Sequence, residues 1–333
     1  MSTFTRLLKR LSVSVGYLLN QRGSVTVDQS WVYRFHDMIH LTYQQMSSLV
    51  QGRVLPGVIH RDVKAQVDFF DRMGNVIAND VISPFGQTKI LNPDHSRRAT
   101  RLQSSDAAVL VSDEHTLRAM VDPTNDYRDT IVAALVRRGD KHIIDAATGT
   151  AETASVTAGS GTITFGTQTL PSGQKIGGAT AIDLARIINS AELLSKAAVP
   201  NGAGERVFFY SPGQLRDILA ITQASSSDFT KNMIHDRGTI NGVDWEGFTW
   251  VEIPDVVDPA LTVLQRMLTL TSTTRSCIAM YRGAVGLAIG REINTRINER
   301  PDLNNSIQVR SLMMMSSVRL FEGGVVQVDT LEN

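Results

Sequence analysis

Apolar residues recur every three to four positions over residues 122–151, in the stretch DPTNDYRDTIVAALVRRGDKHIIDAATGTA. That spacing places them on one face of an α-helix, whereas a strand would alternate at every second residue. Asn125 or Asp126 can cap the start, and acidic residues in the first turn suit the positive helix end. The pattern predicts an amphipathic helix over residues 126–147, with close packing or a bend at Gly139. Its apolar stripe consists of Ile131, Ala134, Leu135, Ile143 and Ala147.

The beginning of the chain predicts two more amphipathic helices. Residues 4–19 and 31–49 each carry an apolar stripe at helical spacing, and Gly52 ends the second. A basic start and an apolar middle also resemble a secretion signal, but no small-residue cleavage site follows. Four basic residues precede the first acidic one: Arg6, Lys9, Arg10 and Arg22. They are candidates for facing nucleic acid or an acidic partner, although a solvated polar face explains them equally well.

Residues 58–111 have an extended texture. VKAQVDFF and RRATRLQ read as strands, and the segment between them is rich in turn residues. The pattern predicts a long, polar, two-stranded ribbon, which is marginal in water unless it leans on another surface. Charges of both signs line the ribbon, as in a contact between complementary chains; a solvated hairpin with ordinary surface charge is the alternative. The candidate contact residues are Arg61, Asp68, Asp71, Arg72, Arg97, Arg98 and Arg101.

Helix and strand signals alternate in the middle of the chain, and strands dominate its end. Residues 148–178 are rich in Thr, Ser and Gly and predict a loop with a short strand or hairpin that opens a new subdomain. Residues 179–199 predict a helix, RVFFY a buried strand, and Ser211 with Pro212 a further helix start. Strand patterns follow beyond Thr239. The fold class is therefore α+β, with sheets built from sequence-distant strands.

Composition narrows the possible roles. The 333 residues hold 20% charged residues, against about 25% in typical domains, which weakly favours assembly. Lys plus Arg equals Asp plus Glu at 33 each, so no global field attracts nucleic acid or an anionic membrane. The only cysteine, Cys277, lies in an apolar run and predicts a buried, reduced thiol, as in a cytosolic protein. The longest apolar stretches fall far short of the ~20 residues that span a bilayer.

Catalytic and metal-binding patterns are weak or missing. His36 and His40 stand one turn apart, as in the metalloprotease helix, but an Asp replaces the Glu that acts as base and no third ligand is evident. Ser211 before a proline is explained by helix capping. Met313, Met314 and Met315 favour a core position over an adaptable binding surface. No catalytic, cofactor-binding or metal-binding residues are predicted.

The stretch at residues 122–151 resembles a segment of tailed-phage major capsid proteins, in which a D-P-T start leads through Tyr and an Ala-Leu-x-R centre to an I-I-x-A…G-T-A end. Matching pieces follow in the same order, and the resemblance covers about residues 31–329. They are FFDRMG, HSRRATRL, VFFYSPGQLRDIL, WEGFTWVEIP, CIAMYRGAVGLAIGREINTRINERPD and a C-terminal strand pair. The chain is thereby identified as similar to this family.

The resemblance implies a Hong Kong 97-type capsid fold with five parts. These are an N-terminal arm with amphipathic helices (1–57), an extended β-hairpin loop (58–111), a peripheral domain (112–180) with a spine helix at 126–147, an axial domain (181–257), and strands returning mainly to the peripheral domain (258–333). One family member joins a loop lysine to an asparagine of a neighbouring subunit. Lys64 and Lys89 are the lysines available here, but nothing around them identifies a catalytic carboxylate or a target, so no crosslinking is expected.

The implied function is structural. A major capsid protein assembles through pentamers and hexamers into an icosahedral head around the double-stranded DNA of a tailed phage. Portal, scaffolding and possibly decoration proteins would be partners, packaged DNA would be contacted non-specifically, and no membrane or cofactor is involved. Assembly would occur in the host bacterial cytoplasm and end in the virion. An encapsulin-like compartment with the same fold is the alternative, and an enzyme using His36 and His40 is a third reading.

Overall fold

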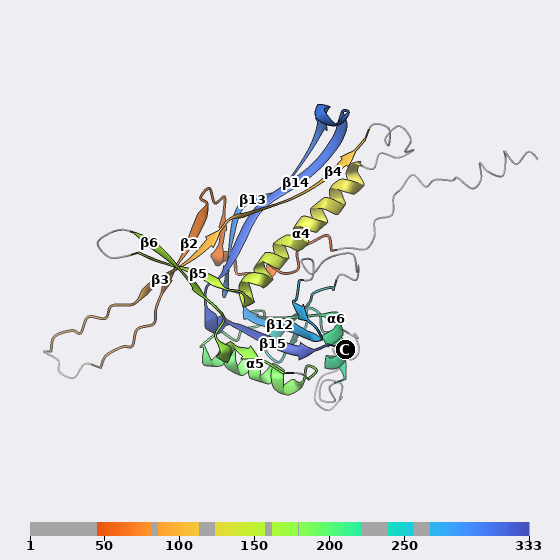
Figure 1. Cartoon of the computed structure of the whole chain (residues 1–333). Coiled ribbons are helices and arrows are strands. Elements are labelled where there is room, and N and C mark those ends of the chain that lie inside the picture. Colours follow the sequence, from red (N-terminus) through yellow and green to blue (C-terminus); the bar gives the residue numbers. More distant parts are fainter. Residues whose placement is uncertain are drawn as a thin grey trace, which may run out of the picture.

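Three β-sheets and three α-helices form the part of the chain that the computed structural model describes, residues 45–80, 86–112, 124–156, 162–178, 180–220, 239–255 and 267–332 (Figure 1). The predicted helix at residues 4–19 lies outside these residues, and so does most of the helix predicted at 31–49. The same holds for Arg6, Lys9, Arg10, Arg22, His36 and His40.

A four-stranded sheet, which we call the long sheet, carries the longest helix on one face (Figure 1). Its strand order is β1–β13–β14–β4, with β1 parallel to β13 and the other neighbours antiparallel. The strands are β1 (Ile59–Arg61), β4 (Gln103–Val111), β13 (Val285–Arg300) and β14 (Ser306–Arg319). The helix is α4 (Thr124–Thr148), which confirms the helix predicted from the apolar stripe.

A glycine lets α4 approach β14 closely. A Cβ at Gly139 would lie 3.3 Å from the Sδ of Met315, which is tighter than most side-chain contacts. Met313 and Met315 are both buried, because alternate residues of β14 face the helix. Ile143 of the helix is fully buried in the same core. The close packing predicted at Gly139 is confirmed, and so is the core position predicted for Met313 and Met315. Met314, which was predicted with them, lies on the other face of β14 and is only half-buried.

One buried carboxylate on α4 organises the segment that enters the fold. Asp140 is 1% exposed and accepts from five donors. They are Gln45 Nε2 at 2.6 Å, Ser48 Oγ, and the backbone N–H groups of Leu49 at 2.9 Å, Val50 at 3.4 Å and Gln51 at 3.4 Å. The helix expected up to residue 49 is wrong for its described end, since residues 45–50 are not helical. Backbone donors there bind a side chain of another element instead of helical carbonyl groups.

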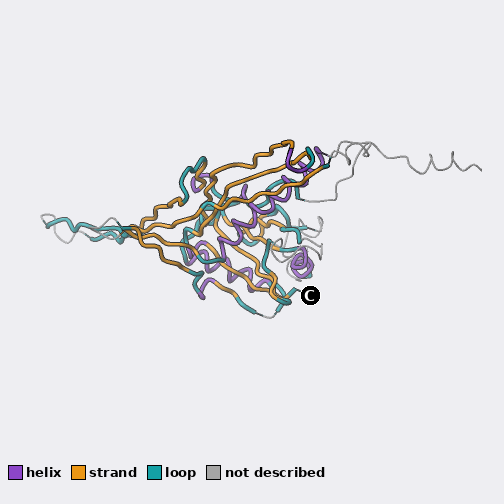
Figure 2. Tube along the Cα trace, turned by 45° about the horizontal axis from the view of Figure 1, so that its top comes forward, coloured by secondary structure: helices purple, strands orange, loops and turns teal. Residues whose placement is uncertain are grey.

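A second four-stranded sheet, the ribbon sheet, projects from the body in both views (Figures 1 and 2). Its order is β2–β3–β5–β6, all antiparallel. The strands are β2 (Val67–Met73), β3 (His95–Arg101), β5 (Ala151–Val156) and β6 (Ile163–Gln168). The two predicted strands exist, but the expectation of an isolated two-stranded ribbon is corrected. The hairpin β5–β6 widens it rather than opening a new subdomain, and β4 leaves it to join the long sheet.

A seven-stranded mixed sheet follows the order β7–β15–β12–β8–β10–β9, with β11 paired to β12. Its strands are β7 (Lys175–Ile176), β8 (Arg206–Tyr210), β9 (Asp244–Trp245), β10 (Phe248–Glu252), β11 (Leu270–Thr271), β12 (Thr274–Tyr281) and β15 (Val325–Leu331). Its helices are α5 (Leu184–Lys196) and α6 (Pro212–Leu219). Short 3-10 turns are η1 (Gln51–Arg53), η2 (Pro56–Val58), η3 (Ser172–Gln174), η5 (Pro301–Leu303) and η6 (Glu322–Gly324).

The last strands of the chain divide between two sheets. We expected residues 258–333 to return mainly to the sheet under the long helix, and β13 and β14 do so. However, β12 and β15 pair with each other, and β12 also pairs with β8. The reason is burial: β8 is buried at all five positions, so it needs a strand on each side, which β10 and β12 supply.

The helix start predicted at Ser211 and Pro212 is confirmed, whereas Asn125 and Asp126, which were expected to cap the long helix, lie inside α4. Asp183 caps α5 by accepting the backbone N–H of Arg186 at 2.9 Å. Before α6, Gln214 Oε1 accepts the backbone N–H of Ser211 at 3.1 Å, as in a capping box. Cys277 is fully buried in β12, as predicted. None of the helices in the described ranges is long and apolar enough to cross a membrane.

We predict that Asp140→Asn lowers the free energy of unfolding by about 2–3 kcal/mol, because the amide nitrogen cannot accept from the donors that the carboxylate serves. Asp145→Asn on the same helix is the control. Its carboxylate is exposed and, among the described residues, forms an ion pair with Lys141 at 3.1 Å, so the loss of this charge should lower the free energy of unfolding by at most about 0.5 kcal/mol. Urea unfolding of both variants measures the difference. Equal losses would show that Asp140 does not anchor residues 45–51.

Candidate assembly interface

The outer part of the ribbon exposes large apolar side chains. Ile77 is 85% exposed and Ile90 is 93% exposed, and Met73, Val76 and Leu91 are also exposed. A hydrogen bond from Gly74 N to Asp94 O at 2.7 Å follows the last paired residues of β2 and β3. Farther out, the described residues of the tip form no strand. Several large apolar side chains exposed on one projecting element are typical of a surface that another chain covers. The tip is therefore the first component of a candidate interface.

Strand alternation divides the charged residues predicted to make contacts. In the pairing of β2 with β3, Asp71 lies opposite Arg97 and Phe70 lies opposite Arg98, so these two pairs face opposite sides. On the outer side, Arg97 Nε binds Asp71 Oδ1 at 2.5 Å. Arg101 binds Glu152 at 3.0 Å, and its guanidinium lies 5.0 Å from the Phe165 ring centre. These pairs are exposed and contribute little to stability, so they can exchange partners at low cost.

The inner side of the ribbon is tied to its own chain. Asp68 binds His60 Nδ1 at 2.6 Å, and the His60 ring stacks on Phe70. Arg72 and Arg98 both bind Glu322, and Arg98 is only 2% exposed. Its burial corrects the expectation that Arg98 is available to another subunit. Side chains alternate between the two faces of β2, and Phe70 is buried. The position of Phe70 in the sequence therefore suffices to tell the inner face of the ribbon from the outer face.

Arg61 lies apart from the ribbon sheet. It ends β1 and pairs with Glu292 of β13, and both side chains are mostly exposed. The seven residues predicted as a contact set therefore fall into three places: the outer ribbon face, the inner ribbon face and the edge of the long sheet.

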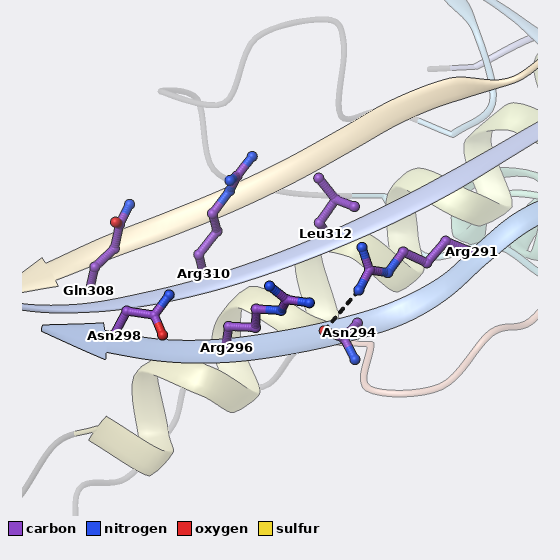
Figure 3. Close-up of a pocket in the computed structure, with 7 residues that line it drawn as sticks. All are labelled: Arg291, Asn294, Arg296, Asn298, Gln308, Arg310 and Leu312. Carbon is purple, nitrogen blue, oxygen red and sulfur yellow. Dashed lines mark hydrogen bonds between the residues drawn. The ribbon is translucent and has the colours of Figure 1, made fainter.

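Sequence reasoning missed a basic groove on the long sheet. It lies on the face opposite α4, where β13 and β14 run side by side (Figure 3). We call it the arginine groove; it consists of Arg291, Asn294, Arg296, Asn298, Gln308, Arg310 and Leu312. The side chains belong to two strands whose register no local pattern reveals.

Two arginines lie directly opposite each other in this groove. Arg296 pairs in register with Arg310, and like charges in that position repel. Arg310 binds Asp106 of β4 at 2.9 Å, and Arg291 Nη2 lies 3.5 Å from Asn294 Oδ1. Guanidinium forks beside amide groups bind carboxylates and phosphates well. The groove is thus the second component of the candidate interface, with a charge suited to an acidic partner.

Burial is the main cause of the pKa shifts of three titratable side chains: His142, Tyr210 and Cys277. Burial, and next the charge of Arg138, lowers the pKa of His142 to about 4. Burial raises the pKa of the Cys277 thiol to about 12, so the nucleophilic thiolate is scarce. Burial also raises the pKa of Tyr210. Among the described residues, no cluster of His, Cys, Asp and Glu is suited to a metal ion.

Comparison with known proteins identifies relatives of this fold. The family described as phage capsid protein matches residues 27–332. No curated protein matches the sequence. The capsid of Ralstonia phage GP4 is similar with a TM-score of 0.62 at 14% identity, over 90% of this chain and 95% of that one. The capsid of cyanophage P-SCSP1u has a TM-score of 0.62 at 15% identity, over 90% and 92%. The structure of Mycobacterium phage Che8 has a TM-score of 0.60 at 15% identity, over 88% and 95%.

A projecting ribbon, a long helix on a four-stranded sheet and a separate mixed sheet define a shell-forming protein of the Hong Kong 97-type fold. The chain belongs to the phage capsid protein family. Its function is that of a major capsid protein, a structural component of the bacteriophage capsid.

We predict that acidification destabilises the chain through His142. Its pKa falls from the ordinary 6.5 to about 4 on folding, so between these values only the unfolded chain takes up the proton. Lowering the pH through this window should therefore lower the free energy of unfolding, by at most about 3 kcal/mol. His142→Gln should flatten this part of the profile, measured by urea unfolding between pH 7 and pH 4. Other histidines titrate in both proteins, so an unchanged profile would exclude His142 as the cause.

Proposed function

We propose that the chain assembles through pentamers and hexamers into the icosahedral head that encloses a tailed phage's double-stranded DNA. The exposed apolar tip of the ribbon, with Ile77 and Ile90 almost fully accessible, carries the proposal. A second copy of the chain is the partner, because a shell repeats one head-to-tail contact that symmetry and curvature close. Each contact need not be strong, since every subunit makes many of them.

The three sheets fit three roles in such a shell. The ribbon sheet corresponds to the extended loop, and α4 on the long sheet corresponds to the spine helix and the peripheral domain. The mixed sheet with α5 and α6 corresponds to the axial domain at the centre of each capsomer. In this assignment β12 and β15 belong with the axial domain, because they pair with each other and β12 pairs with β8.

The wider set of partners follows from the same role. We infer a non-enzymatic protein that works with portal, scaffolding and possibly decoration proteins and assembles in the host bacterial cytoplasm. Arg6, Lys9, Arg10 and Arg22 are proposed to face the packaged DNA through non-specific contacts. The family match favours the phage role over an encapsulin-like compartment, and nuclease-protected DNA inside native particles would separate the two.

Two surfaces of this chain are proposed to meet between neighbouring copies. The outer ribbon face offers Asp71, Arg97 and Arg101 in exposed pairs that can re-pair across an interface. In the arginine groove, Arg296 lies opposite Arg310, which is already paired with Asp106, and an acidic side chain of a neighbour beside Arg296 would reduce the remaining repulsion. Leu312 in the groove and Leu110 on the same sheet add apolar area, which favours a protein partner.

We predict that the double variant Ile77→Asp with Ile90→Asp folds normally but loses assembly. Both side chains are exposed in the single chain, so the free energy of unfolding should change by less than about 0.5 kcal/mol. Burying two carboxylates in an apolar contact should reduce the assembled fraction at least about tenfold. Electron microscopy and sedimentation measure this, and the wild type should give capsomers or closed shells. Thr88→Asp, also exposed on the tip, adds charge without removing an apolar group and should assemble. Normal shells from the double variant, or a wild type that stays monomeric under all conditions, would refute the proposal.

Charge reversal in the arginine groove should separate folding from assembly. Arg296→Glu places opposite charges across β13 and β14, so the free energy of unfolding of the unassembled chain should rise by about 0.5 kcal/mol. The concentration needed for assembly should nevertheless rise several-fold, and Arg296→Gln should lie between the two. Light scattering at low and high salt measures this threshold. A threshold that is the same in all three proteins would remove the groove from the interface.

A further inference from the structure

Two guanidinium groups bind one carboxylate at the base of the ribbon, and a third interacts with the same carboxylate only through its charge. Arg72 comes from β2, Arg98 from β3 and Arg319 from the end of β14, whereas Glu322 belongs to the turn η6. Arg72 Nη2 lies 3.5 Å from Glu322 Oε2, and Arg98 Nη2 binds Glu322 Oε1. Arg72 also lies over the Phe321 ring, at 5.2 Å from its centre. The cluster therefore joins the ribbon to the end of the long sheet.

Arg319 is held by backbone carbonyl groups. Its Nη1 donates to Ala147 O at 3.0 Å and to Gly149 O at 2.6 Å, at the C-terminal end of α4. Its Nη2 donates to Gln168 O at 2.9 Å, and the Gln168 side chain accepts from Arg98 at 2.8 Å. Gln168 thereby links the two arginines.

The positive charge of the three arginines exceeds the negative charge close to them. Glu322 supplies one negative charge and the end of α4 about half of one, so three arginines retain about one and a half positive charges. Arg98 is 2% exposed and Arg319 is fully buried. Burial lowers the pKa of both arginines, and for each of them Glu322 only partly opposes this effect. Buried charge of one sign is costly unless a counter-charge is close.

Donor atoms of the cluster are also left over. The Nε atoms of Arg72, Arg98 and Arg319, and Nη1 of Arg98, are buried and have no hydrogen-bond partner. The other acids of the ribbon strands have partners elsewhere. Asp71 and Glu152 lie on the opposite face, where they bind Arg97 and Arg101, and Asp68 on the inner face binds His60. Within the described residues, charge balance and donor count both indicate a missing negatively charged acceptor.

We propose that this cluster binds a small oxyanion of the phosphate class. Such an ion offers several acceptor oxygens and matches the forked donors of arginine. The burial of Arg98 and Arg319 favours a free ion over a carboxylate side chain of another copy. Access lies on the side of Arg72 and Glu322, which are 22% and 16% exposed. Because the cluster connects β2 and β3 to β14 and α4, the bound ion fixes the direction in which the ribbon projects.

Thermal unfolding of the full-length, unassembled protein tests the proposal. Inorganic phosphate is titrated at constant pH and ionic strength, with chloride as the balancing ion. The melting temperature of the wild type should rise and saturate, and equilibrium dialysis should find one phosphate per chain. Arg72→Gln should raise the half-saturating concentration by about tenfold, since it removes one charge-assisted contact.

Arg97→Gln is the matched control, because it removes an arginine from the outer face of the same two strands. It should bind phosphate like the wild type. The proposal is overturned if phosphate stabilises no better than chloride, or if both variants respond alike. It is also overturned if phosphate does not stabilise the unassembled chain, and assembly in the absence of phosphate stabilises the wild type but not the Arg72→Gln variant. In that case the acceptor is a carboxylate of a neighbouring chain.

Discussion

The contact between α4 and β14 is the constraint on which the other parts of the fold depend. Gly139 allows the helix to rest against Met315, and Asp140 beside it binds the segment at residues 45–51. The C-terminal end of the same helix accepts from Arg319 and leads directly into β5 of the ribbon sheet. One helix therefore positions the long sheet, the entering segment and the ribbon relative to one another. A shift of the helix along β14 would move all three together.

The ribbon combines a polar, tightly held base with an apolar, uncovered tip. At the base, Thr100 binds Ser316 at 2.7 Å and Arg98 binds Glu322, so the inner face is fixed to β14 and its following turn. At the tip, Ile77 and Ile90 contribute nothing to the core of their own chain. This division is useful in a repeating shell. The base sets the direction in a single subunit, and the stabilisation of the tip becomes available only when another subunit covers it.

Local patterns predicted the kinds of element well but not their partners. The stripe through Ile131 and Ile143 and the cap at Ser211 depend on neighbours a few residues away, which the sequence displays. Whether β12 joins β8 or β13 depends on pairing between distant segments, which periodicity does not encode. For the same reason the groove with Arg296 opposite Arg310 could not be foreseen. The split between Arg97 and Arg98 was accessible, because alternation and one buried phenylalanine suffice to assign the two faces.

Other buried arginines of the chain show why the base of the ribbon is exceptional. Arg206 is 2% exposed, and no carboxylate of the described residues binds it. Carbonyl oxygens of Ala191, Val199 and Pro200, together with Ser195 Oγ, nevertheless accept from all of its nitrogen atoms. Arg275 is equally buried and binds two carboxylates, Asp255 at 2.6 Å and Glu332 at 2.5 Å. The fold thus compensates buried guanidinium groups completely where they serve only its interior. Compensation is incomplete at Arg98, where the rigid body meets the element that reaches toward a neighbour. A bound counter-ion at that junction makes the direction of the ribbon depend on solution conditions, whereas α5 and the mixed sheet are stabilised without one.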